Sequence, residues 1–327
     1  MIARVLAGLL VAALLVAGGL AAFGWRVFER PGPLRAARAV VIPRGSFDEV
    51  LGRLQAAGAL PAGEAWRLGG RLAAMLTGGA GAVHAGELAF PAHASLATLL
   101  RVLRTAAPVE HRLTLPEGLT AAEIAGLLAQ DPALSGPTPV PPEGSVLPET
   151  YEFSLGTTRQ ALLARAERAM TDRLAAIWAG SDPSAGLRDR SELLILASLV
   201  ERETAQPGER PMVARVFLNR LRDGMRLQSD PTVAFAATGG LGALHRPLSR
   251  ADLALDNPYN TYTAPGLPPG PICAPGVAAL EAVAHPASGP ELYFVADGSG
   301  RHVFATDLAE HRLHVEALRA REAAGGR

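Results

Sequence analysis

The sequence predicts an α+β protein attached to an N-terminal apolar helix. Three observations support this fold class: an uninterrupted apolar stretch opens the chain, a strand-turn-helix pattern occurs three times, and long helical patterns precede a C-terminal strand hairpin. The chain has 327 residues, of which 49% are hydrophobic, so it can bury a substantial core. A typical size of about 150 residues per domain then suggests two folded parts.

The composition argues against several classes of function. The formal net charge is zero, so the bulk charge gives no indication of nucleic-acid binding. Cys273 is the only cysteine, which excludes an intramolecular disulfide and any metal site built from several cysteines. His-Glu-x-x-His spacing, a Gly-x-Ser-x-Gly turn and a phosphate-binding loop are also missing from the sequence. We therefore expect no metal, no cofactor and no nucleic-acid partner.

The apolar stretch at residues 5–23 predicts a single membrane anchor. As a helix it would span about 28 Å, which is just enough to cross a bilayer. We expect a cytoplasmic stub at 1–4 and a proline-containing linker at 24–39. A cleaved signal peptide is the alternative, because Gly19-Leu20-Ala21 resembles a cleavage site. Arginines between residues 26 and 38 oppose the usual positive-inside orientation, but both interpretations export the rest of the chain.

Three short units follow the linker. Each unit has an apolar run, a proline and an amphipathic helical segment, and they start at residues 40, 88 and 113. The expected helix N-caps are Ser46, Ser95 and Thr120, and Thr120 forms a capping box with Glu123. One strand and one helix cannot bury their apolar faces alone, so we expect the three units to pack on one another. Glycan binding and ordinary ligand-free βα units are both compatible with this pattern.

The second half of the chain is mainly helical, with a strand hairpin near its end. Asp189 is the expected N-cap of the second long helix, with Glu192 completing a capping box. The hairpin has its strands at 292–295 and 302–304, joined by a turn rich in glycine and serine. The predicted helices cover residues 159–179, 191–204, 212–222 and 308–322.

Glu201 is the main catalytic candidate. It ends a helical segment, 193–201, that is apolar on nearly all sides and is therefore expected to be buried. Desolvation of a carboxylate favours its protonated form, so the pKa of Glu201 should be raised, as a glycosidic general acid requires. Helical geometry turns Glu203 about 200° away, and we expect that side chain to be in water. The alternative is that Glu201 forms an ion pair with an arginine such as Arg215 or Arg220.

Two later segments contain candidate substrate-binding residues. Gln228 and Asp230 lie in a polar segment after a helix stop, where they could bind sugar hydroxyls or merely close a turn. Tyr259, Asn260 and Tyr262 combine aromatic rings with polar groups, a mixture typical of sugar sites. Asp230 is also the more plausible second carboxylate, since glycosidases generally place two on either side of the scissile bond.

Taken together, these motifs resemble the MltG/YceG family of endolytic murein transglycosylases, and the resemblance covers nearly the whole chain. The first glutamate of the family's Glu-x-Glu-Thr motif matches Glu201, which the resemblance implies is catalytic. Arg202 stands where the family commonly has lysine. The matching segments are 115–118, 148–153, 197–204, 216–221, 227–232 and 259–262, the last followed by 266–270.

This resemblance implies the domain organisation and the reaction. It implies a LysM-like module at 40–107 and a catalytic domain at 108–327, outside the inner membrane. The implied reaction cleaves nascent peptidoglycan strands and leaves 1,6-anhydro ends, because the muramic acid 6-hydroxyl attacks its own anomeric carbon. We expect peptidoglycan synthases, the penicillin-binding proteins, as partners. The alternatives are a hydrolytic muramidase, in which Asp230 guides a water, and a glycan-binding scaffold without activity.

Overall fold

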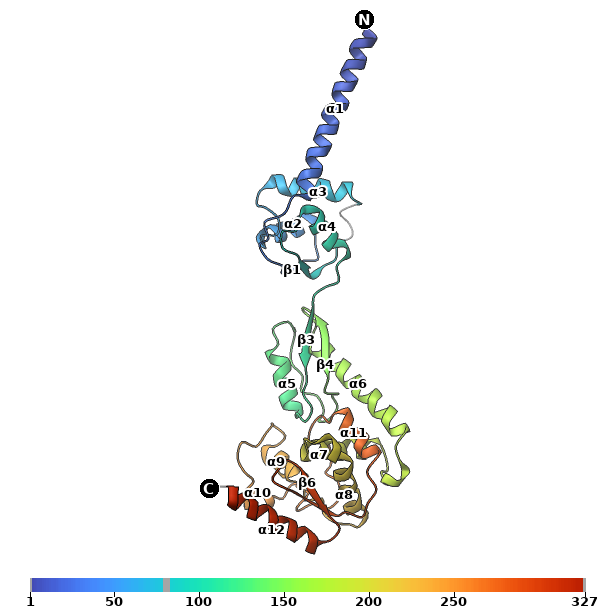
Figure 1. The fold of residues 1–327 in the computed structure, drawn as a ribbon, viewed down its shortest axis with the longest axis vertical. Coiled ribbons are helices and arrows are strands. Elements are labelled where there is room, and N and C mark those ends of the chain that lie inside the picture. Colours follow the sequence, from blue (N-terminus) through green and yellow to red (C-terminus); the bar gives the residue numbers. More distant parts are fainter. Residues whose placement is uncertain (1, 79–82, 326–327) are drawn as a thin grey trace. The chain divides into compact units, whose positions relative to one another are not determined.

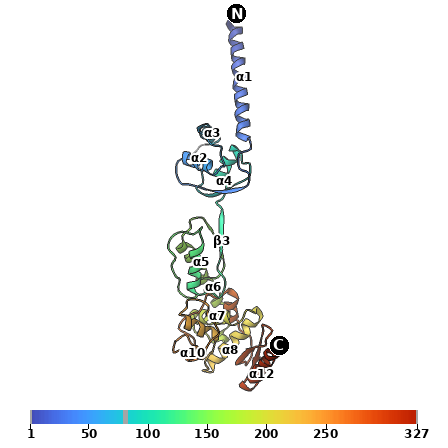
Figure 2. The same ribbon diagram turned by 90° about the vertical axis from the view of Figure 1, so that its left-hand side faces the viewer.

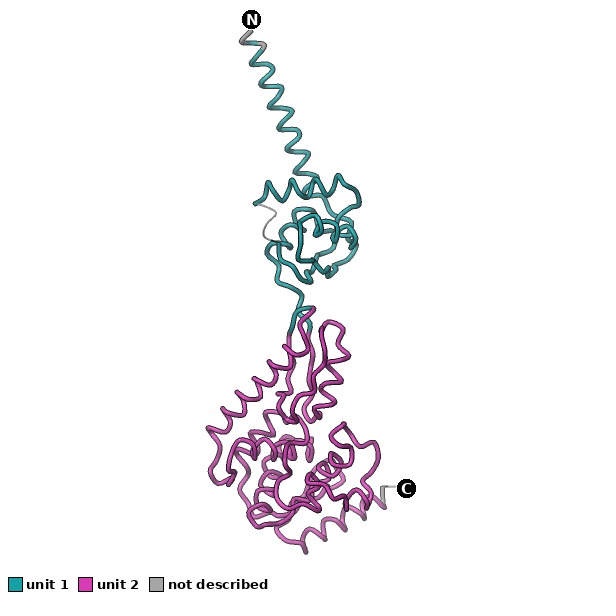
Figure 3. The backbone as a smooth tube through the Cα atoms, turned by 180° about the vertical axis from the view of Figure 1, so that it is seen from behind, with its two compact units in different colours: residues 1–111, 153–155 teal, residues 112–152, 156–327 magenta. Residues whose placement is uncertain are grey.

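The computed structural model describes residues 2–78 and 83–325, which form two compact units (Figure 3). Unit 1 contains residues 1–111 and 153–155, and unit 2 contains residues 112–152 and 156–327. Both units mix helices with short strands, so the predicted combination of helix and strand is confirmed.

The chain opens with helix α1, Ile2–Glu29, whose side chains are largely exposed. Residues 6–29 of this helix are long and apolar enough to cross a membrane, by length and composition alone. The helix includes residues 24–29, so the first part of the predicted linker is helical. The rest of the linker is held by unit 1, because Gly32 N donates to His93 O at 3.1 Å and His93 N donates to Leu34 O at 2.8 Å.

Unit 1 is built on two antiparallel strands, β1 (Arg38–Ile42) and β2 (Gly86–Phe90), which are aligned with Val40 opposite Leu88. Inward side chains of both strands join the apolar faces of the helices in one core. Ser46 and Ser95 cap their helices through their side chains, as predicted. The helices of this unit after α1 are α2 (Phe47–Ala56), α3 (Glu64–Leu76) and α4 (Leu96–Thr105), of which α3 was not predicted.

The third strand-turn-helix unit does not belong to unit 1 as a whole, which corrects our expectation that the three units form one module. Its strand β3, Glu110–Thr114, pairs with β4, Thr150–Ser154, and its helix α5, Ala121–Gln130, belongs to unit 2. The sequence of β3, Glu-His-Arg-Leu-Thr, offers little apolar surface to the core of unit 1. The predicted capping box of Thr120 and Glu123 is confirmed.

Unit 2 is organised around helix α7, Arg190–Glu203, which packs against α8 (Arg210–Arg222) and α11 (Val277–Ala284) in one apolar core (Figures 1 and 2). Asp189 caps α7 as predicted, but Glu192 accepts a hydrogen bond from Arg188 N instead of closing a capping box. The helices expected near 159–179, 191–204, 212–222 and 308–322 are all present. The remaining elements are α6 (Arg159–Ala179), α9 (Asp230–Thr238), α10 (Arg250–Leu253), α12 (Leu308–Gly325), the 3-10 turns at Pro183–Ala185 and Pro207–Glu209, and the hairpin strands β5 (Tyr293–Ala296) and β6 (His302–Ala305).

A buried hydroxyl fixes a loop to the middle of α7. Ser198 Oγ accepts from Ile272 N at 3.0 Å and donates to Ile195 O at 2.7 Å. This holds the segment before α11 against the helix, and Cys273 Sγ adds a contact to Ser198 O at 3.3 Å.

We expect Ser198→Ala to lower the free energy of unfolding by about 1–3 kcal/mol, because the buried Ile272 N–H loses its acceptor. Ser191→Ala is the matched control, since Ser191 is exposed in the first turn of the same helix. Urea unfolding of both variants measures the effect. Equal loss in the two variants would contradict a role for this hydrogen bond.

Candidate active site

Glu201 lies near the end of α7 in an ion pair. Its Oε1 is 2.8 Å from Arg210 Nη2, its Oε2 accepts from Gly276 N at 3.0 Å, and its side chain is only 6% exposed. The two arginines considered from the sequence, Arg215 and Arg220, instead donate to backbone carbonyls. The partner arginine is thus supplied by the start of α8, which is close to Glu201 in the sequence but follows a break in the helix.

The pKa of Glu201 is raised, as predicted, with desolvation as the largest cause. The Gly276 N–H and the Arg210 guanidinium oppose this shift, whereas the neighbouring Glu117 carboxylate adds to it. Glu117 is the most exposed member of this cluster, at 45%, and its Oε2 is 3.6 Å from Arg210 Nη2. Both oxygens of Glu201 are therefore engaged, and one arginine lies between two carboxylates.

Glu203, expected in water, is instead covered. Ser229 Oγ donates to its Oε1 at 2.5 Å, and desolvation raises the pKa of this carboxyl to about 7. The nearby Asp230 carboxylate also raises the pKa of Glu203, while the Ser229 hydroxyl and the positive charge of Arg220 lower it. The residue keeps partial exposure. Helical geometry correctly turned Glu203 away from Glu201, but it could not show that a distant loop covers that side of the helix.

The covering loop is the polar segment Gln228–Asp230. Ser229 is buried, and its N–H donates to Thr261 Oγ1 at 2.9 Å, while Gln228 N donates to Thr261 O at 3.2 Å. Gln228 has a φ of 51°, a left-handed conformation that is uncommon for a residue with a side chain. Such strain persists where surrounding contacts impose it, and it often occurs at functional sites. The side chains of Gln228 and Asp230 are left exposed on either side of Ser229.

Tyr262 completes the group around Glu203. Its hydroxyl donates to Asp230 Oδ1 at 2.6 Å, and both burial and the Asp230 carboxylate raise the pKa of the phenol. The charge of Glu203 raises the pKa of Tyr262 as well, which indicates that the three groups interact. Tyr262 therefore stays a neutral donor that fixes the direction of the Asp230 carboxylate.

The two other predicted cleft residues are held by the protein itself. The ring of Tyr259 packs on Phe235, with ring centroids 4.8 Å apart. Asn260 is fully buried, its amide donates to Leu255 O at 2.9 Å, and its Oδ1 accepts from Tyr262 N at 3.0 Å. The structure thus gives Asn260 a positioning role beneath Tyr262.

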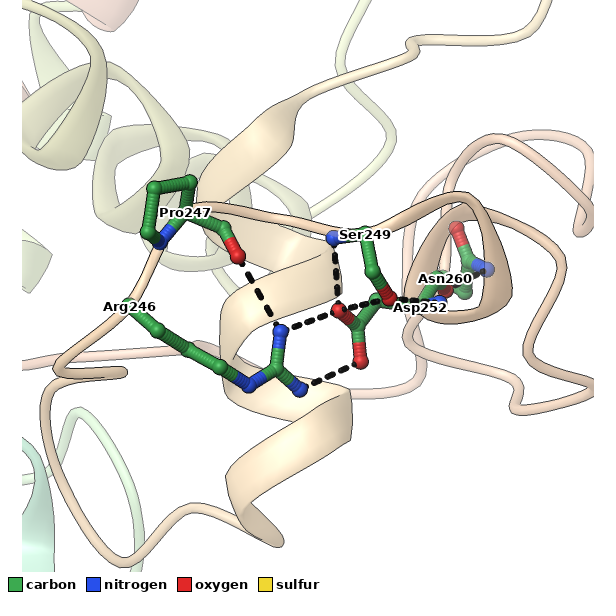
Figure 4. Close-up of polar contacts among 5 residues, drawn as sticks. All are labelled: Arg246, Pro247, Ser249, Asp252 and Asn260. Carbon is green, nitrogen blue, oxygen red and sulfur yellow. Dashed lines mark hydrogen bonds and ion pairs between the residues drawn. The ribbon is translucent and has the colours of Figure 1, made fainter.

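An ionic network stabilises the loop that receives the Asn260 amide (Figure 4). Asp252 accepts from Arg246 Nη2 at 2.8 Å and from Ser249 N at 2.8 Å. These bonds hold the pKa of Asp252 well below its usual range. The carbonyls that Asn260 reaches, including Asp252 O at 3.4 Å, belong to this ordered turn.

Ser229, Asp230 and Tyr262 therefore lie around Glu203, whereas Glu201 faces a separate cluster with Glu117, Arg210 and Gly276. The sequence placed Glu203 in water and gave it no role, although it belongs to the same motif as Glu201. A cavity of about 700 Å³ lies at the opposite end of α7, lined by residues such as Arg188 and Pro265, and includes neither glutamate. Across residues 2–78 and 83–325, no three His, Cys, Asp or Glu side chains are grouped so as to hold a metal ion.

The chain was compared with families of known proteins. The model of the YceG-like family matches residues 40–317. The chain is a member of the YceG-like family. It is 37% identical over 171 residues to a Bacillus subtilis protein named endolytic murein transglycosylase, covering 52% of this chain and 46% of that one. A Streptococcus pneumoniae protein of the same name is 35% identical over 179 residues, covering 53% of this chain and 31% of that one.

The fold of this YceG-like chain is also shared with a solved structure. A crystal structure of a YceG-like protein from Listeria monocytogenes matches with a TM-score of 0.52 and 25% sequence identity, covering 85% of this chain and 99% of that one. The alignments to the curated relatives, by contrast, span less than half of those proteins' lengths. The similarity to these relatives therefore concerns only a part of each protein.

We expect Glu203→Gln to stabilise the fold increasingly as the pH rises. The pKa of Glu203 in the folded state, about 7, is above its ordinary value of 4.5. The wild-type carboxyl therefore contributes stability below pH 4.5 that is lost as the pH rises through 7. Relative to the wild type, Glu203→Gln should gain up to about 3 kcal/mol between pH 4 and pH 8, as measured by urea unfolding. A difference that stays constant over this pH range would contradict the raised pKa.

Proposed function

We propose that this protein is an endolytic murein transglycosylase that cleaves glycan strands within the peptidoglycan chain. The observation that carries the proposal is the nearly buried carboxyl of Glu201 at the end of α7, whose pKa is raised by desolvation, in a chain that belongs to the YceG-like family. A carboxyl with a raised pKa can give up a proton in one step and take one up in the next, as one residue serving both steps requires. Membership of the YceG-like family and the names of its relatives supply the substrate class.

In the proposed reaction, Glu201 is the only proton carrier. Protonated Glu201 donates to the glycosidic oxygen as the bond to the muramic acid anomeric carbon breaks, and the leaving sugar departs with a free hydroxyl. The Glu201 carboxylate, stabilised by the Gly276 N–H, then takes the proton from the 6-hydroxyl while that oxygen attacks the anomeric carbon. The 1,6-anhydro end forms without consuming water, and Glu201 regains its proton. Gln228 and Asp230, whose side chains are exposed, are proposed to bind the sugar, and Tyr262 directs the Asp230 carboxylate.

Glu201 is the catalytic residue that the family resemblance implies. Without substrate, its carboxylate is occupied by Arg210 and by Gly276 N, so a substrate oxygen has to displace one of them. Glu203 is the competing assignment, because desolvation raises its pKa to about 7 and the Ser229 hydroxyl donates to it. The following experiment separates the two.

We expect Glu201→Gln to lower the rate of cleavage of purified, un-crosslinked glycan strands by at least about 100-fold. Glu203→Gln should cause a much smaller loss, because in this proposal its carboxyl holds the Ser229 segment in place. Glu316→Gln, an exposed change on α12, is the control. Mass spectrometry of the products should find ends that weigh one water less than reducing ends.

Each other outcome excludes one part of the proposal. Loss of cleavage in Glu203→Gln with activity kept in Glu201→Gln would assign the acid to Glu203. Reducing ends would identify a hydrolytic muramidase, in which Asp230 guides a water. Unchanged cleavage in both variants would favour a glycan-binding scaffold whose apparent activity comes from elsewhere.

The proposal also covers location and partners. Residues 5–23 anchor the protein in the inner membrane, with residues 1–4 in the cytoplasm and the folded units outside; α1 and its apolar composition support this. Residues 40–107 form a LysM-like glycan-binding module, and residues 108–327 form the catalytic domain. Peptidoglycan synthases of the penicillin-binding class are the proposed protein partners, because they make the strands that are cleaved.

We expect alkaline phosphatase fused after Ala22 or after Arg327 to be active in cells, since the enzyme works only when exported. Carbonate washing of membranes should leave the full-length fusion in the membrane fraction if residues 5–23 remain as an anchor. Inactive fusions at both positions would place the folded units in the cytoplasm. Release by carbonate of an active fusion would indicate a cleaved signal peptide.

A further inference from the structure

Helix α3 presents its large apolar side chains to the outside of unit 1. Leu68 is 56% exposed, Leu72 51%, Met75 66% and Leu76 85%. Spacings of four, three and one residues place all four on one face of a helix. A surface helix of a globular protein normally turns such a face toward the core.

The opposite face of α3 is the one that packs on unit 1. The fully buried residues of this helix are small, Gly70 and Ala74. A Cβ at Gly70 would come within 2.9 Å of Leu51 Cδ2, so this glycine allows the helix to lie close to the core. Arg104 donates to Ala74 O at 3.0 Å and to Thr77 O at 2.9 Å, which satisfies carbonyls at the end of α3. The helix is therefore well supported on its inner side and bare on its outer side.

The bare face of α3 continues into the surface of α1. The two helices line one open groove of about 610 Å³ that is mostly apolar. Helix α3 runs crosswise to α1 near the lower end of that helix (Figure 1). The residues lining this groove include Leu20, Phe23, Trp25 and Phe28 of α1 and Leu72 and Leu76 of α3.

The part of α1 that lines the groove is the end of its apolar stretch. The predicted anchor ends at Phe23, and Trp25 and Arg26 follow. Tryptophan and arginine at the end of a membrane span are typical of the interface between acyl chains and head groups. A helix that lies across α1 at this level would run parallel to the bilayer surface, at the depth where amphipathic helices bury their apolar face.

We infer that α3 is an interfacial helix, which lies in the head-group region of the bilayer that α1 crosses and inserts Leu68, Leu72, Met75 and Leu76 toward the acyl chains. The inference rests on the anchor proposed above but not on the catalytic activity. The continuous apolar surface of α1 and α3 favours lipid as the occupant over a second copy of the chain. The charged residues at the edge of this face are paired, since Arg71 Nε is 2.8 Å from Asp48 Oδ1 and Arg67 Nη1 is 3.5 Å from Glu64 Oε1.

The test places an environment-sensitive fluorophore on single introduced cysteines of the full-length protein. L72C and L76C report on α3, R101C on the exposed side of α4 is the control, and L14C on α1 reports on the anchor. The samples are vesicles of phosphatidylethanolamine and phosphatidylglycerol, with or without lipids that carry a spin label near the head group. Cys273 is buried, and a sample without an introduced cysteine corrects for its labelling.

We expect blue-shifted emission at positions 72 and 76 and several-fold stronger quenching by the lipid spin label there than at position 101. Emission and quenching equal to those at position 101 would overturn the inference, provided that position 14 reports the acyl region. A blue shift without lipid quenching would assign the face to a second copy of the chain and also overturn it. Failure at position 14 would instead refute the anchor, and none of these readouts depends on the cleavage activity.

Discussion

The middle of helix α7 is buried, and two carboxylates at its end must therefore be accommodated where water is scarce. A desolvated carboxylate is unfavourable unless it is paired, hydrogen-bonded or protonated. The protein uses two different solutions on opposite sides of the same helix. Glu201 is paired with Arg210 and accepts a backbone N–H, whereas Glu203 has one hydroxyl donor and an acidic neighbour.

These two environments differ in the ease of proton transfer. Protonating Glu201 would leave Arg210, whose side chain is 8% exposed, facing only the more distant Glu117. Protonating Glu203 instead removes a negative charge from the neighbourhood of Asp230 and leaves a carboxyl that can still bond with Ser229. Burial at the end of α7 thus raises the pKa of both carboxyls, and different hydrogen-bond donors oppose the two shifts: Gly276 N–H at Glu201 and the Ser229 hydroxyl at Glu203.

Local sequence signals predicted the local structure well. The side chains of Ser46, Ser95 and Thr120 cap the expected helices, because capping depends on atoms only three residues apart. The long helix at 159–179 has the predicted bounds for a similar reason, since Thr158 supplies its cap and Gly180 ends it. The site also depended on contacts between distant segments. Ser229 reaches Glu203 from 26 residues away, and Thr261 holds Ser229 from a further 32, so no helical period could show that Glu203 is covered.

The same limit explains helix α3 and the pairing of β3. An amphipathic pattern shows that a helix has an apolar face, but it does not show what the face contacts. In α3 the close approach needed by Leu51 selects a face of glycine and alanine for the core, and the leucines must then face outward. The polar strand β3 pairs with β4, and Thr114 Oγ1 lies 2.9 Å from Thr150 Oγ1 in this pair. The packing of neighbouring segments, which the local sequence does not show, decided both the outward face of α3 and the pairing of β3. A large exposed apolar face commonly marks an interaction site, and the exposed face of α3 lies next to a helix long and apolar enough to span a membrane.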